Sequence, residues 1–273
     1  MMVRALLVIA AAGLLASCGA TLQVGPNTQA AASQPAQPPQ PTPSAKTEQI
    51  SPQQRSLLRT DLAAGYYERG QMAVALEELN EAVKLDPNNG RAYNIYGLVY
   101  AMLGENAKAE ESFQKGLALA PNDSDIHHNW GWYLCTHGKP RESIGEFEAA
   151  LRNPLYRTPE IALINAGRCS ASFGDVKAAE TYYRRALAVV PGDANALYGL
   201  ALMSYKAARY DEARNWMKLA VGRPNPAPET LYLGMCIERS LGDRQAELSY
   251  MSQLRNRYPD SAETRAIASG SCE

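Results

Sequence analysis

The 32 residues from Gly90 to Pro121 read GRAYNIYGLVYAMLGENAKAEESFQKGLALAP, and the pattern of this stretch decides the fold of most of the chain. Two runs of helix-forming residues lie on either side of Gly104, and glycine favours the left-handed conformation that often ends a helix. Pro121 ends the second run, because proline cannot continue a helix. The stretch therefore predicts two helices joined by a tight turn.

The same pattern recurs along the chain. Pro87 and Pro121 lie 34 residues apart, and Pro191 ends a similar run, A-L-A-V-V-P. This spacing is the period of the tetratricopeptide repeat, a helical hairpin that stacks on its neighbours. With these prolines at position 32 of each unit, the six units begin near Ser56, Gly90, Ser124, Glu160, Ala194 and Pro228.

Residue size follows the same period. Small residues recur at positions 8, 20 and 27, where helices must approach closely, and larger apolar residues at position 24 fill the space between them. The pattern predicts an all-α fold, a right-handed superhelical solenoid of six hairpins over residues 51–260 with a polar C-terminal tail at 261–273. The residues at position 8 are Ala63, Gly97, Gly131, Gly167 and Ala201, and those at position 24 are Leu79, Phe113, Phe147, Tyr183 and Met217.

Two units depart from the pattern. The turn between the two helices carries glycine at position 15 in every unit except the fifth, where Ala208 predicts a less tight turn. The sixth unit has Glu247 at position 20 in place of a small residue. Because terminal repeats must face water, we interpret the sixth unit as a closing cap.

The N-terminus has the layout of a secretory signal peptide at residues 1–17, with one positive charge at Arg4 and an apolar run behind it. Leu15-Ala16-Ser17-Cys18 resembles the bacterial lipobox, which predicts that Cys18 is lipidated after cleavage. In bacterial lipoproteins, Gly at position 19 implies sorting to the outer membrane. The alternative is an ordinary signal peptide with an incidental cysteine. Residues 18–50 are rich in Pro, Gln and Ala and predict a disordered tether.

Composition argues against several function classes. The chain has a formal charge of -1, which gives no basic excess for nucleic acid, and only three histidines. His127, His128, Cys135 and His137 do not make a closed tetrahedral metal set, and no nucleotide or hydrolase motif is present. We therefore expect a monomeric, non-enzymatic protein without a cofactor or a metal. A thiol-dependent enzyme is a distant alternative.

The third unit is two residues longer than the others, and the extra length lies in N-P-L-Y-R-T-P, residues 153–159. Asn153-Pro154 predicts the end of one helix, and Thr158-Pro159 predicts an N-cap and a first-turn proline for the next. The loop either changes the angle between two halves of the solenoid or exposes Leu155, Tyr156 and Arg157 to a partner.

Four cysteines remain after Cys18, an even number in an oxidising compartment. Cys135 and Cys169 fall late in the first helices of neighbouring units, which predicts a disulfide across this junction. Cys236 and Cys272 are the remaining candidate pair. Free buried thiols are the alternative for both pairs.

The concave surface is the candidate binding site. In such solenoids it is lined by positions 2, 5, 9, 12 and 13 of each first helix, and exposed apolar residues there suggest that a partner peptide or helix docks. The alternative is that these side chains touch the next repeat and are buried. The predicted groove residues of the first three units are Leu57, Thr60, Tyr67, Arg91, Asn94, Leu98, Met102, Asp125, His128 and Trp132.

Three strings resemble a known family. N-W-G-W-Y-L-C-T-H-G-K-P-R-E-S-I at 129–144, N-P-L-Y-R-T-P at 153–159 and N-A-G-R-C at 165–169 are similar to the type IV pilus biogenesis/stability lipoproteins, the PilF/PilW family. The resemblance implies six tetratricopeptide repeats on the periplasmic face of the outer membrane. It implies a pilotin that binds the secretin subunit and promotes assembly of the secretin ring. A repeat lipoprotein for β-barrel insertion, or one that recruits cell-wall enzymes, is the alternative.

Overall fold

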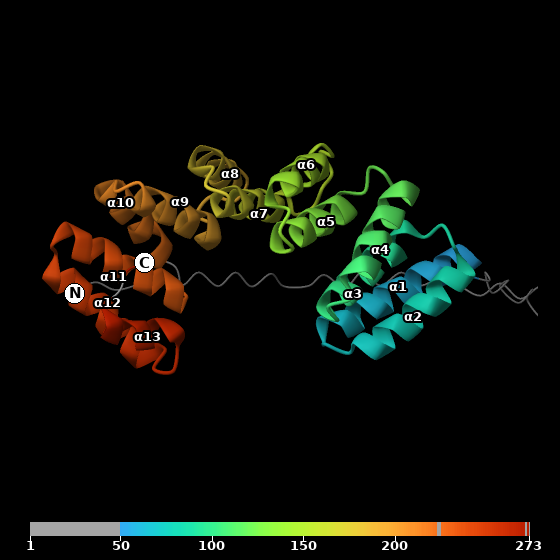
Figure 1. Cartoon of the computed structure of the whole chain (residues 1–273), viewed down its shortest axis with the longest axis horizontal. Coiled ribbons are helices and arrows are strands. Elements are labelled where there is room, and N and C mark those ends of the chain that lie inside the picture. The colour runs from blue at the N-terminus through green and yellow to red at the C-terminus, as the bar shows by residue number, and fades with distance from the viewer. Residues whose placement is uncertain (1–49, 223–224, 271, 273) are drawn as a thin grey trace, which may run out of the picture. The chain divides into compact units, whose positions relative to one another are not determined.

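The computed structural model describes residues 50–222, 225–270 and 272, and every regular element within these ranges is a helix (Figure 1). The predicted signal peptide, Cys18 and all of the tether except Ile50 lie outside the described residues. Twelve helices form six consecutive pairs: α1 (Pro52–Glu68) with α2 (Met72–Leu85), α3 (Gly90–Met102) with α4 (Asn106–Leu119), α5 (Ser124–Thr136) with α6 (Pro140–Leu151), α7 (Pro159–Ser172) with α8 (Val176–Val189), α9 (Ala194–Lys206) with α10 (Tyr210–Val221), and α11 (Pro228–Leu241) with α12 (Arg244–Arg257).

The helices pack as a repeat array. The two helices of each pair contact each other most extensively, and each pair also contacts the next pair along the chain. The first helices of four units begin at the residues that the repeat numbering predicts, and α7 begins one residue earlier. The predicted fold, an all-α solenoid of six tetratricopeptide hairpins, is confirmed. Among the described residues, no helix is both long and apolar enough to cross a membrane.

The small residues of the repeat are needed for close packing. The residues at position 20 of the first five units have no exposed surface, and those at position 27 have almost none. A Cβ atom on Gly97 would lie 2.7 Å from the Phe113 ring, and one on Gly167 would lie 2.8 Å from the Tyr183 ring. Because real contacts of this kind are longer, the ring of the second helix requires glycine on the first.

The turn in the fifth unit is as tight as the others, so the expectation for Ala208 is wrong. Ala208 has φ 57° and takes the left-handed conformation that Gly174 takes in the fourth unit with φ 86°. The amide of Ala208 donates to Tyr205 O at 2.9 Å, and the amide of Arg209 donates to Ser204 O at 2.9 Å. These hydrogen bonds hold an alanine where glycine is favoured, at a cost of about 1 kcal/mol.

The C-terminal tail is folded. After α12 the chain forms a short helix, α13 (Ala262–Ala266), and a 3-10 turn (Ile267–Ser269). Ile267 is 7% exposed and packs in one cluster with Leu231, Met235 and Leu254 of the last hairpin. The tail therefore covers apolar surface of the last hairpin that would otherwise meet water. The polar tail predicted from the sequence is thus an additional cap.

Glu247 is buried in the sixth unit and paired. It is 3% exposed, and its two carboxylate oxygens accept from Arg239 at 2.8 Å and from Arg244 at 2.7 Å. Hydrogen bonds from Arg239 and then from Arg244 lower the pKa of Glu247. A paired carboxylate therefore replaces the small residue of the other units.

Candidate functional site

The groove face consists of positions 2, 5, 9, 12 and 13 of the first helix of each hairpin. Thr60 and Asn94, two of its ten predicted residues, are buried, with 1% and 5% of their surface exposed. The remaining eight reach solvent to different degrees: Tyr67, Leu98, His128 and Trp132 are half-buried, and Leu57, Arg91, Met102 and Asp125 are exposed.

Thr60 and Asn94 connect repeats, which corrects their assignment as partner-binding residues. The Thr60 hydroxyl donates to Ser56 O at 2.9 Å and accepts from the Asn89 side-chain amide at 2.9 Å. Asn94 Oδ1 accepts from Asn129 Nδ2 at 3.1 Å, across the next pair of units. Because buried polar groups need such partners, these side chains are committed to the array and unavailable to a ligand.

The exposed residues of this face are both apolar and charged. Leu57 on α1 and Met102 on α3 have 40% and 62% of their surface exposed. Arg91 forms an ion pair with Asp61 at 3.1 Å, and both side chains are more than half exposed. Such a pair contributes little stability, so a charged partner can displace it at low cost. The face can thus bind apolar side chains with charged groups beside them.

Leu98 and Trp132 belong to the packing of the helices. Leu98 packs against the cluster that contains Phe113 and Trp130, and Trp132 packs against the cluster around Phe147. Replacing either side chain would remove buried apolar contacts, which commonly costs several kcal/mol in a core. Their exposed edges still line the groove, but they are poor positions at which to test binding alone.

His128 joins the groove face to the loop at 153–159. Its Nδ1 lies 2.9 Å from the Tyr156 hydroxyl, and its Nε2 lies 3.3 Å from Asn165 Nδ2. Both ring nitrogens thus have a polar partner, and a neutral imidazole has one donor nitrogen and one acceptor nitrogen. Burial lowers the pKa of His128 to about 4, so the ring is neutral at pH 7.

The loop itself is held at one residue and exposed at another. Tyr156 packs against the cluster around Phe147, whereas Leu155 has 83% of its surface exposed. Thr158 is the N-cap residue of α7 and Pro159 is its first residue, as the sequence predicts, although the Thr158 side chain makes no capping hydrogen bond. A partner can therefore reach Leu155 and Arg157, together with Asn153 and Pro154, which are also exposed.

A disulfide joins the third and fourth units beside this loop. Cys135 on α5 and Cys169 on α7 are bonded, with an S–S distance of 2.01 Å and Cα atoms 5.8 Å apart. Cys169 has no exposed surface and lies in the core cluster between these units. The bond ties the two first helices across the junction that the longer loop enlarges.

The three histidines have separate partners. His127 Nδ1 lies 2.6 Å from Glu146 Oε2, and this hydrogen bond raises the pKa of His127. The His137 ring stacks on Tyr133 with centroids 4.0 Å apart. Within the described ranges, no three His, Cys, Asp or Glu side chains gather to hold a metal ion.

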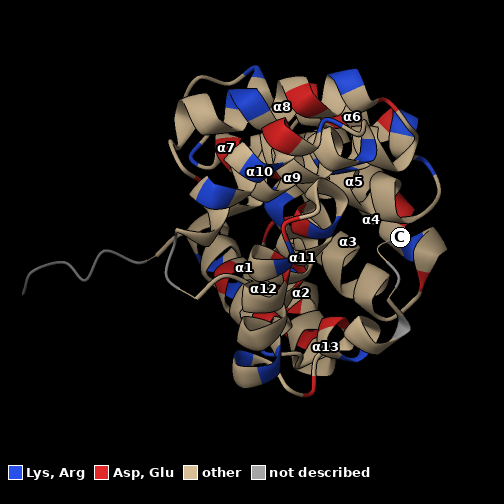
Figure 2. Cartoon of the chain, turned by 90° about the vertical axis from the view of Figure 1, so that its left-hand side faces the viewer, with Lys and Arg blue, Asp and Glu red and all other residues tan. Residues whose placement is uncertain are grey.

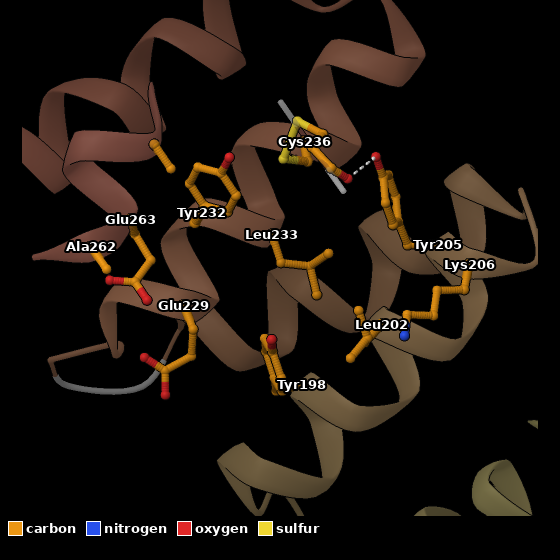
Figure 3. Close-up of a pocket in the computed structure, with 12 residues that line it drawn as sticks. Tyr198, Leu202, Tyr205, Lys206, Glu229, Tyr232, Leu233, Cys236, Ala262 and Glu263 are labelled. Atoms are coloured by element: carbon orange, nitrogen blue, oxygen red, sulfur yellow. Dashed lines mark hydrogen bonds between the residues drawn. A yellow bond between two sulfur atoms is a disulfide. The ribbon is translucent and has the colours of Figure 1, made fainter. Parts of the chain in front are cut away.

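The groove face of the last two units, for which no site was predicted from the sequence, has a cavity of about 540 Å³ (Figure 3). Positions 5, 9, 12 and 13 of the fifth unit and positions 2, 5 and 9 of the sixth line it. The same repeat positions that define the predicted groove in the first three units therefore also give these residues in the last two units. They are Tyr198, Leu202, Tyr205, Lys206, Glu229, Tyr232 and Cys236.

Charged residues of both signs alternate over the helices. Figure 2 shows basic and acidic positions close together on the visible face. Many form ion pairs between units, such as Arg185 with Glu148 at 2.7 Å and Lys139 with Glu110 at 3.0 Å. This arrangement is typical of a solvent-exposed surface with charges of both signs.

Comparison with known proteins identifies the repeats. A tetratricopeptide-repeat family model matches residues 60–124, 128–188 and 171–228, and a second tetratricopeptide-repeat model matches 231–261. The chain is 25% identical over 202 residues to the type IV pilus assembly protein PilF of Pseudomonas aeruginosa, covering 74% of this chain and 80% of that protein.

Two solved structures extend the comparison. The crystal structure of PilW, a widely conserved type IV pilus biogenesis factor, is 34% identical with a TM-score of 0.71, covering 78% of this chain and 98% of PilW. The structure of Pseudomonas aeruginosa PilF has a TM-score of 0.71 at 23% identity, covering 81% of this chain and 99% of that chain. The PilF likeness supports the fold.

Proposed function

The chain belongs to the tetratricopeptide-repeat family of type IV pilus biogenesis proteins, and from this premise we propose that it is a pilotin-like lipoprotein that binds the pilus secretin subunit. The observation that carries the proposal is the exposure of two large apolar side chains, Leu57 and Met102, at predicted groove positions. A groove of this kind suits an extended segment or a helix of a partner protein.

The proposed mechanism is escort. The groove face of the first three units holds an exposed segment of the secretin subunit, and a lipid on Cys18 anchors the complex to the periplasmic face of the outer membrane. Two or more acyl chains make such an anchor effectively permanent, because each buried methylene contributes about 0.8 kcal/mol. Ring assembly then takes place at the outer membrane. The protein acts without catalysis and without a cofactor.

The residues of the groove have separate parts in this binding. Leu57 and Met102 supply apolar contacts, and Arg91 and Asp125 supply charges that fix the register of the segment. The half-buried edges of Tyr67, Leu98, His128 and Trp132 form the floor between them. A partner that covers the two exposed side chains gains about 1 to 3 kcal/mol from each.

The direct test measures affinity for the purified secretin subunit. The double variant Leu57→Ala/Met102→Ala should bind at least tenfold more weakly and should keep its helical circular dichroism, because both side chains are exposed. Leu219→Ala is the matched control, since Leu219 is 57% exposed but lies on the second helix of its hairpin. An unchanged affinity of the double variant would remove the groove from the proposal.

A further inference from the structure

The cavity at the C-terminal end of the groove face is built by two kinds of structure. Its floor comes from α9 and α11, and one wall comes from the C-terminal segment, through Ala262, Glu263 and Cys272 (Figure 3). The C-terminal segment is not part of any repeat. The cavity therefore exists because this chain places a non-repeat segment against the groove face.

The wall is fixed by residues at groove positions. Cys236, at position 9 of the sixth unit, forms a disulfide with Cys272. Arg239, at position 12, donates to Gly270 O at 2.7 Å, and Tyr205, at position 12 of the fifth unit, donates to Cys272 O at 3.4 Å. In this region, side chains of the groove face thus already donate hydrogen bonds to main-chain carbonyl groups of the C-terminal segment.

The cavity has an apolar centre with charges at its two ends. Tyr198, Leu202 and Leu233 lie in the middle of the view, with Glu229 and Glu263 on one side and Lys206 on the other (Figure 3). The two carboxylates come from different elements, α11 and α13, and neither forms an ion pair with another described residue. An incoming basic group would therefore meet two carboxylates that are not already neutralised.

We propose that this cavity is a second docking site, which takes an extended partner segment with an apolar side chain on Tyr198 and Leu233 and a Lys or Arg side chain beside Glu229 and Glu263. The disulfide Cys236–Cys272 builds the site by holding its wall. The site lies in the last two units and is distinct from the proposed secretin-binding face of the first three units. The two proposals can therefore be tested independently.

The charge selection is tested with two fluorescently labelled hexapeptides and the full chain in detergent, by anisotropy. One peptide has a Phe and a single Arg in a Gly–Ser background, and the other has a Phe and a single Glu at the same positions. The Arg peptide should bind at least tenfold more tightly than the Glu peptide. Glu229→Gln/Glu263→Gln should abolish most of this difference. Equal binding of both peptides, or no saturable binding of the Arg peptide at about 1 mM, would overturn the proposal.

The wall is tested with Cys236→Ala/Cys272→Ala, which removes one disulfide and leaves Cys135–Cys169 intact. This variant should lose at least tenfold in affinity for the Arg peptide while its circular dichroism stays helical. Unchanged affinity would show that the disulfide does not build the site. Leu57→Ala/Met102→Ala is the control and should bind the peptide like the unmodified protein, so failure here is distinguishable from failure at the secretin-binding face.

Discussion

The junction between the third and fourth units and the C-terminal end of the chain each contain a disulfide of similar span, 34 and 36 residues, but the two bonds join different kinds of structure. Cys135–Cys169 joins the first helices of two consecutive repeats, so it strengthens contacts that the repeat already makes. Cys236–Cys272 joins a repeat to a segment that no repeat supplies. The first bond stabilises the array, and the second adds a surface to it.

The surroundings of the two bonds differ in the same way. Near the junction, the Tyr156 hydroxyl and Asn165 both contact His128, and Cys169 has no exposed surface. At the C-terminal end, the segment is held by hydrogen bonds from Arg239 and Tyr205 and by the buried side chain of Ile267. Loss of the first bond should therefore affect the whole array, whereas loss of the second should be local.

The largest expected effect is at the junction. Cys135→Ala/Cys169→Ala should lower the free energy of unfolding by about 4 kcal/mol, because the chain-entropy model gives about this value for a closed loop of this length. Urea denaturation followed by circular dichroism measures it, and we expect the two halves of the array to unfold in separate steps. A single transition with unchanged midpoint would remove the distinction between the two regions.

The second-largest expected effect is a loss of folding stability at the junction in acid. The folded pKa of His128 is about 4 and lies below the ordinary value of 6.5. As the pH falls, His128 therefore binds a proton at a higher pH in the unfolded chain than in the folded chain. The stability present above pH 6.5 decreases by up to about 3 kcal/mol as the pH falls towards 4. His127 has a raised pKa and acts in the opposite direction.

The comparison of wild type with His128→Gln isolates this contribution, because His127 is present in both proteins. The stability difference between them should shrink by up to about 3 kcal/mol between pH 7 and pH 4, as measured by urea denaturation at each pH. All three histidines lie in the third unit, so the acid effect should appear there. A difference independent of pH would show that His128 is not held neutral by the fold.

The C-terminal disulfide should have a smaller and local effect. Cys236→Ala/Cys272→Ala should lower the stability of the array by only about 1 to 2 kcal/mol, because the short terminal segment can detach while the hairpins stay folded. Amide hydrogen exchange should accelerate in α13 and remain slow in α5 and α7. Acceleration throughout the array would mean that the two disulfides are equivalent.

The smallest expected changes in stability are at two turns, one near each region. Gly174→Ala should cost about 1 kcal/mol, because an L-residue is placed at φ 86° with no contact to offset it. Ala208→Gly should gain about 0.5 to 1 kcal/mol by relieving the strain at φ 57°. Thermal denaturation of both variants checks the pair, and a loss of stability in Ala208→Gly would contradict the assignment of strain.

The repeat could be predicted from the sequence because its signals are local and periodic. The positions of Gly97, Phe113 and Ala109 follow from residue size and a fixed spacing alone. The Ala208 turn was mispredicted because hydrogen bonds to neighbouring carbonyls outweigh the preference for glycine. The folded tail was missed because α13 has only five residues and depends on tertiary contacts.

The groove was predicted in part. Eight of its ten predicted residues reach solvent, and their part in partner binding stays a prediction. The burial of Thr60 and Asn94 depends on hydrogen bonds between units, which no single repeat reveals. The C-terminal cavity was missed because the rule was not applied beyond the third unit. Both disulfides join the cysteines that the sequence analysis paired. The contribution of Cys272 to the wall required the structure, since a candidate pair does not by itself place the C-terminal segment against the groove face.

The measurement that tests the central claim most directly is a blot for heat-resistant secretin rings in outer-membrane fractions. It compares a strain lacking the gene with strains carrying the intact gene or Leu57→Ala/Met102→Ala, alongside total outer-membrane protein. We predict that the rings are lost without the gene, restored by the intact gene and strongly reduced with the double variant. Intact rings in the deletion strain, with a general loss of β-barrel proteins, would contradict the secretin assignment.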